Sequence, residues 1–62
     1  MPKVGQRIRI EMLDDPCCQN YVGKEGEITL IEKDPWGDTR MEGTWGSIAI
    51  YPSVDKFSII QG

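Results

Sequence analysis

Apolar and polar side chains alternate along several short stretches of this sequence, and turn-forming residues separate these stretches. In residues 5–11, GQRIRIE, Ile8 and Ile10 point to one side of an extended backbone while the charged side chains point to the other. A period of two residues predicts a β-strand with one buried face. A second strand is predicted over residues 27–33, where the alternation is less clean because the strand bends and serves two layers.

Two turn sequences predict the third and fourth strands. In DPWGD, Pro35 fixes φ and Gly37 supplies a positive φ, so the turn closes a hairpin from the second strand onto a third strand, residues 39–45. The GS dipeptide that follows makes a tight turn into a fourth strand over residues 47–51, SIAIY. Its isoleucines again alternate with the residues between them, as a strand with one buried face requires.

The end of the chain completes the predicted fold. In PSVD, Pro52 lacks a backbone donor and ends the fourth strand, so we expect one 3-10 turn with Val54 as its inward anchor. A last strand, KFSII, covers residues 56–60. Five short strands, a long first loop over residues 12–23 and a tight third turn predict a single all-β domain, a five-stranded SH3-like small barrel. The OB fold needs a helix between its third and fourth strands, and this sequence leaves no room for one.

The charge balance argues against nucleic acid as a partner. Seven Lys and Arg residues stand against ten Asp and Glu residues, which gives a net charge of −3. Nucleic-acid binding depends on clustered cations, and the cations here are scattered among acids. No apolar run approaches the roughly 18 residues of a membrane span, and no signal peptide opens the sequence. We therefore expect a short, complete cytoplasmic product.

Reactive side chains are too few, and too poorly spaced, to predict an enzyme or a metal site. Cys17 and Cys18 are adjacent, so a bridge between them would strain the peptide, and we expect a reducing compartment. Two thiols and no histidine do not make a zinc site, which leaves only a metal shared between two copies. Asp14 and Asp15 are neighbours on an exposed loop, where their pKa values are not driven apart as an acid–base pair requires. We expect no catalysis, no cofactor and a structural or recognition role for these two acids.

The sequence resembles domain-of-unknown-function family 4314, which comprises short proteins of phages and conjugative elements in gut Firmicutes. The matching stretches are VGQRIRIEMLDDP, VGKEGEITLI and GSIAIYPSVDKFSII, which span most of the chain. The segments CCQNY and DPWGDTRMEGTW depart from the family pattern. The resemblance implies a mobile-element origin and an SH3-like fold, with DDP shaping the first loop. It implies no known activity.

Five aromatic residues provide the main clue to function. Phe57 is predicted to lie in the core, and Trp45 has the inward parity of its strand. Trp36 stands at the tip of a turn, where a large ring has little to pack against. Tyr21 in the first loop and Tyr51, which has the outward parity of its strand, are likewise expected to have little to pack against. Alternatively, Trp36 folds back and caps the open end of the barrel.

In an SH3-like barrel the first loop and the tip of the second hairpin flank one groove, so we expect the exposed aromatic residues to line a common surface with an acidic rim. The predicted binding residues are Asp14, Asp15, Tyr21, Trp36, Tyr51 and Pro52. Such a surface suits a proline-rich or basic protein segment. The resulting hypothesis is a protein-interaction module that binds or inhibits a host factor, such as a defence or nucleic-acid-handling protein.

Three alternatives remain at this point. A KOW-like nucleic-acid-binding module would use Arg7, Arg9, Lys24 and Arg40 against the phosphate backbone. A ligand- or nucleotide-sequestering oligomer would use an aromatic pocket between subunits. The aromatic patch would otherwise seal a weak homodimer, since a small domain gains from added burial. The charged first strand is predicted to be an edge that discourages edge-to-edge pairing.

Overall fold

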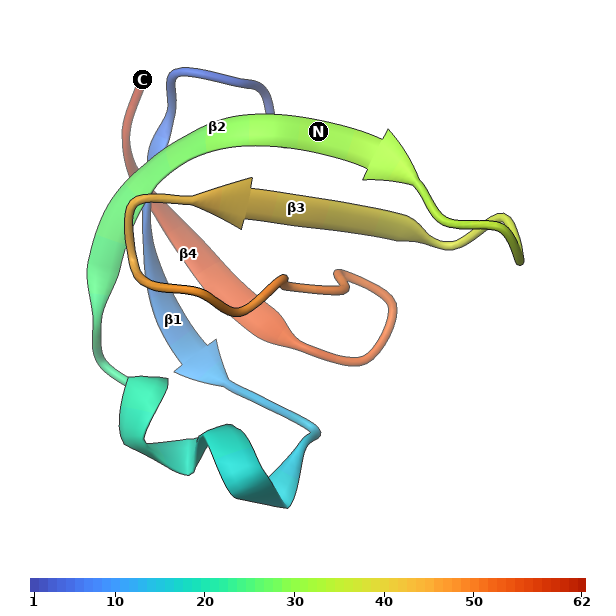
Figure 1. The fold of residues 1–62 in the computed structure, drawn as a ribbon. Helices are drawn as coiled ribbons and strands as arrows, with labels where there is room; N and C mark the ends of the chain where they lie inside the picture. The colour runs from blue at the N-terminus through green and yellow to red at the C-terminus, as the bar shows by residue number, and fades with distance from the viewer.

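Four antiparallel strands and one short 3-10 helix form the computed structural model, which describes residues 1–62 (Figure 1). The elements are β1 (Arg7–Met12), η1 (Pro16–Tyr21), β2 (Glu25–Lys33), β3 (Thr39–Gly43) and β4 (Lys56–Gln61). The strands lie in the order β3-β2-β1-β4, and every neighbouring pair is antiparallel. The long strand β2 is bent, and its first part pairs with β1 while the rest pairs with β3 (Figure 1).

The core lies on the face of the sheet that the alternation in β1 predicts. Ile8 and Ile10 of β1 are fully buried, together with Ile28 of β2 and Met41 of β3. Each such side chain contributes roughly 1.5–3 kcal/mol relative to an exposed position. Leu13, Trp45 and Ile50 complete the buried cluster, so Trp45 is a core residue, as predicted. Phe57, predicted to lie in the core, is only half-buried and packs against this cluster without belonging to it.

Trp45 enters the core because the chain leaves a gap for its ring at Gly43. A Cβ atom at Gly43 would overlap both the indole of Trp45 and the backbone oxygen of Glu27. The indole Nε1 of Trp45 donates a hydrogen bond to the carbonyl oxygen of Ile48 at 2.9 Å. A buried indole N–H needs such a partner. The third strand consequently ends at Gly43 and not at Trp45.

The predicted fourth strand is reduced to a single bridge between Met41 and Ile50, and the sheet is not closed into a barrel. The two residues exchange backbone hydrogen bonds of 2.8 Å in both directions. On either side of Ile50, side chains take the groups that a strand would pair. The carbonyl of Ile48 accepts from Trp45, and the N–H of Tyr51 donates to the carboxylate of Asp55. These competing bonds explain why the alternation in SIAIY produces no regular strand.

Two further predictions need correction. The single 3-10 turn predicted before β4 is confirmed, because the Tyr51 carbonyl accepts from the Val54 N–H, and the 3-10 helix over Pro16–Tyr21 in the first loop was not predicted. Val54 is exposed, and the inward anchor of this turn is Asp55. The first strand is not an edge, because β1 lies between β2 and β4.

No helix in the structure has the length and apolarity required to cross a membrane.

Candidate functional site

An open pocket of about 370 Å³ lies between the segment after β1 and the segment before β4. Its lining residues are Leu13, Asp14, Asp15, Cys18, Ile48, Ala49, Tyr51, Val54 and Asp55. Most of them are apolar, three are carboxylates, and none is basic. We call this feature the acidic pocket. Its chemistry suits a ligand that combines apolar surface with positive charge.

Asp55 joins the two walls of the acidic pocket. Its Oδ1 accepts a hydrogen bond from the backbone N–H of Asp14, and its Oδ2 accepts one from the backbone N–H of Tyr51, both at 2.9 Å. The residue is only 8% exposed. Hydrogen bonds to an ionised group are stronger than neutral ones, and they offset the cost of burying the carboxylate. Asp55 therefore has a structural role, and no cation neutralises its charge.

Asp15 organises the helix that forms one side of the acidic pocket. As the N-cap of η1, its Oδ1 accepts a hydrogen bond from the backbone N–H of Cys17 at 2.8 Å, and Pro16 occupies the first position of the helix. Both features are typical helix-start signals. The side chain of Asp14 is exposed and has no hydrogen-bond or ion-pair partner in the protein. Of the three carboxylates, Asp14 is thus the most available to a ligand.

The two cysteines are free thiols, with Cys17 exposed and Cys18 half-buried. Partial burial raises the pKa of the Cys18 thiol, and the carboxylate of Asp15 raises it further through its charge and a hydrogen bond. The Sγ of Cys18 lies 3.6 Å from the Oδ2 of Asp15. A thiol held in its protonated form is a poor nucleophile. No group of three or more Cys, Asp or Glu side chains is arranged to hold a metal ion.

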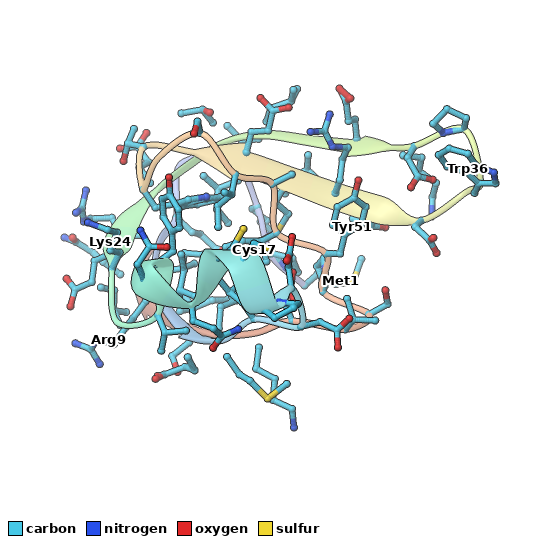
Figure 2. The ribbon with its side chains drawn as sticks, turned by 60° about the horizontal axis from the view of Figure 1, so that its bottom comes forward. Met1, Arg9, Cys17, Lys24, Trp36 and Tyr51 are labelled. Atoms are coloured by element: carbon cyan, nitrogen blue, oxygen red, sulfur yellow. The ribbon has the colours of Figure 1, made fainter.

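The tip of the β2–β3 hairpin presents Trp36 to solvent. The indole residue is 84% exposed, so the alternative in which it folds back over the barrel end is wrong. The turn beneath it is well ordered by Asp34, whose Oδ1 accepts hydrogen bonds from the N–H groups of Trp36 and Asp38, both at 2.9 Å. Gly37 supplies the positive φ of 86° that the turn needs. Figure 2 shows Trp36 at the far end of the hairpin, away from Cys17 in η1.

The structure brings only part of the predicted binding surface together. Asp14, Asp15 and Tyr51 line the acidic pocket. Tyr21 does not line it: its ring lies directly against Gly46 and packs on the core. Pro52 is half-buried and also lies outside the lining, and Trp36 stands apart on the hairpin tip (Figure 2).

Sequence reasoning missed most of the pocket lining, including Ile48 and Asp55. The acidic pocket exists because the segment that contains Ile48 does not form a regular strand. The one local signal is Asp55 itself, an acid that directly precedes an apolar strand, and the structure shows it facing inward.

The cations that a nucleic-acid interface would need are partly committed to ion pairs. Arg9 contacts Glu25 at 2.8 Å, and Arg40 contacts Glu42 at 3.0 Å. Figure 2 shows Arg9 and Lys24 at the opposite end of the molecule from Trp36. Lys33 adjoins the hairpin tip, where its Nζ donates a hydrogen bond to the carbonyl of Gly37 at 3.3 Å, and no basic residue lines the acidic pocket.

Comparisons with family models, with curated proteins and with solved structures give no match for this chain.

Proposed function

We propose that this chain is a non-enzymatic protein-interaction module whose binding anchor is Trp36. The single observation that carries this proposal is the exposure of the indole on an ordered hairpin tip. Burying a large apolar side chain stabilises a fold by about 3 kcal/mol, and the exposed indole of Trp36 does not contribute this stabilisation. Tryptophan is also among the residues that most often dominate the free energy of protein binding. An indole held in this way is available for insertion into a pocket on another protein.

The chemistry of the proposed partner follows from charge. The chain has a net charge of −3, and the acidic pocket contains three carboxylates without a cation. A basic segment that adds apolar contacts is the complementary ligand, and opposite charge would also steer its approach. The resemblance to family 4314 suggests a mobile-element origin. We infer that the partner is a host protein with a basic surface, met in the host cytoplasm.

The proposed fold is a five-stranded SH3-like barrel in which residues 47–51, the predicted fourth strand, are present in a distorted form. The bridge from Ile50 to Met41 lies beside β3, at the opposite end of the sheet from β4. Adding this segment to the sheet gives the strand order of such a barrel. It would also make the acidic pocket the gap between the distorted strand and the first loop.

Comparative capture from a Firmicute lysate tests the proposed function. The bait is the wild-type chain, with Trp36→Ala and Leu30→Ala as variants; Leu30 is an apolar residue of the same hairpin, 40% exposed. We expect specific proteins to be retained by the wild type and by Leu30→Ala, and to be lost with Trp36→Ala. Equal recovery by all three baits would show that the indole is not the anchor.

Two other functions are weakened by the charges just described. Arg9 and Arg40, two of the four cations considered for a phosphate interface, are held in ion pairs, and an acidic pocket repels a nucleotide. Fluorescence anisotropy with labelled DNA and RNA at low salt tests nucleic-acid binding. Thermal stabilisation by a nucleotide panel tests nucleotide sequestration. We expect no binding in either experiment.

A further inference from the structure

A free pair of backbone groups adjoins the acidic pocket at Ala49. Ile50 directs both its N–H and its carbonyl toward Met41 of β3. In an extended backbone the groups of the preceding residue point to the opposite side, away from β3. Ala49 lines the acidic pocket, and neither its N–H nor its carbonyl has a hydrogen-bond partner in the protein. Backbone groups left free in this way can pair with an extended segment of another chain.

The side chains of the acidic pocket select the chemistry of the occupant. Asp15 and Asp55 already accept hydrogen bonds from backbone N–H groups, whereas the carboxylate of Asp14 is free. The charges of all three attract a cation, but Asp14 is the one most available for direct pairing. The apolar lining includes Leu13 and Ile48, which suit an aliphatic stem. The volume of about 370 Å³ lies within the range of ligand sites, roughly 300–1,000 Å³.

We propose that the acidic pocket receives a lysine side chain from an extended segment of a protein partner. The ammonium group pairs with the carboxylate of Asp14, and the backbone of the segment bonds the free groups of Ala49. Lysine fits better than arginine, because a guanidinium carries five N–H donors and the pocket offers one free carboxylate. The inference rests on the proposed function in one respect, namely that the partner is a protein.

Charge and backbone together distinguish this occupant from the others. An acidic segment is repelled by the carboxylates of the pocket, and a purely apolar segment leaves Asp14 unpaired. A free alkylamine satisfies Asp14 but leaves the backbone of Ala49 without a partner. A lysine within an extended peptide satisfies both.

NMR titration of the full chain with a capped pentapeptide, Gly-Leu-Lys-Leu-Gly, tests the proposal. We expect saturable amide shifts at Asp14, Ala49 and Tyr51. Norleucine in place of the lysine keeps most of the stem without the charge and should weaken binding about fivefold. Arginine in its place should also weaken binding. n-Butylammonium should shift the amide of Asp14 but not that of Ala49, and methylation of the lysine backbone nitrogen should weaken the peptide.

The matched pair of variants is Asp14→Asn and Asp38→Asn, each of which removes one negative charge from an exposed side chain without a partner. Asp14→Asn should weaken the lysine peptide about fivefold. Asp38→Asn, on the β2–β3 hairpin, should bind it like the wild type. The amide spectra of the free variants establish that both are folded.

Absence of saturable shifts up to about 5 mM peptide would overturn the proposal. Equal affinity for the norleucine peptide, or in Asp14→Asn, would overturn the role of charge. Equal affinity for the N-methylated peptide would overturn the backbone pairing, and equal or tighter binding of the arginine peptide would overturn the choice of lysine. The proposed function fails separately, because Trp36→Ala should bind the peptide like the wild type while losing the host proteins.

Discussion

At the scale of single residues, two side chains depart from the usual distribution between core and surface. Asp55 is the only charged residue that the fold buries, and Trp36 is a large aromatic residue that the fold leaves in water. The first is explained inside the molecule, since both carboxylate oxygens of Asp55 accept backbone hydrogen bonds. Nothing inside the molecule explains the exposure of Trp36. That contrast is why we assign a structural role to Asp55 and a binding role to Trp36.

Replacing Asp55 should destabilise the fold. Asp55→Ala removes two hydrogen bonds to a charged acceptor and leaves the N–H groups of Asp14 and Tyr51 without it. We expect the free energy of unfolding to fall by about 3 kcal/mol in urea denaturation. Asp55→Asn, which keeps one acceptor, should lose less. Asp14→Ala is the control and should change stability by less than about 0.5 kcal/mol. An unchanged midpoint for Asp55→Ala would contradict the structural role.

The raised pKa of Cys18 predicts slow alkylation of this thiol in the folded chain. Only the thiolate is alkylated, and a raised pKa keeps Cys18 protonated to higher pH. The pH profile of iodoacetamide labelling at Cys18, followed by peptide mass spectrometry, should therefore rise at higher pH in the folded chain than in the urea-unfolded chain. Asp15→Asn should shift the Cys18 profile to lower pH, whereas Asp14→Asn should not. The same linkage means that the folded state loses stability relative to the unfolded state as pH rises through the pKa of the unfolded thiol.

At the scale of elements, alternation and turn chemistry predicted what depends on local sequence. The strands around Ile8 and Ile28 and the DPWGD hairpin were predicted because each forms from contiguous residues. The predicted strand over residues 47–51 is absent because neighbouring side chains hold its backbone groups: the indole of Trp45 bonds the carbonyl of Ile48, and the carboxylate of Asp55 bonds the N–H of Tyr51. The alternation of apolar residues does not reveal such bonds. The acidic pocket depends on a long-range contact, the hydrogen bond from the Asp14 N–H to the Asp55 carboxylate, so the sequence did not predict it.

The hairpin that carries Trp36 should depend on Asp34. Its Oδ1 accepts from the backbone N–H groups of Trp36 and Asp38, so Asp34→Ala removes the bonds that order the turn. We expect faster amide hydrogen exchange at both positions and a loss of stability of about 1 kcal/mol. Asp38→Ala, whose side chain makes no such bond, serves as the control. Unchanged exchange in Asp34→Ala would mean that the turn does not need this acid.

At the scale of the whole molecule, the core is small. Only nine of the 62 residues are buried, and the Cα radius of gyration is 10.6 Å. A domain of this size has a narrow stability margin, so a surface that binds a partner or a second copy also stabilises the fold. The hairpin tip and the acidic pocket are the surfaces proposed for a protein partner.

The most direct test of the proposed binding role is photo-crosslinking from position 36 in cells of the proposed host, a Firmicute. A benzoylphenylalanine replaces Trp36 in one chain and Leu30, the exposed residue in β2, in a control chain. The account predicts a discrete adduct with one or a few host proteins from position 36 and none of these from position 30. Identical adducts from both positions, or no protein adduct from position 36, would contradict it.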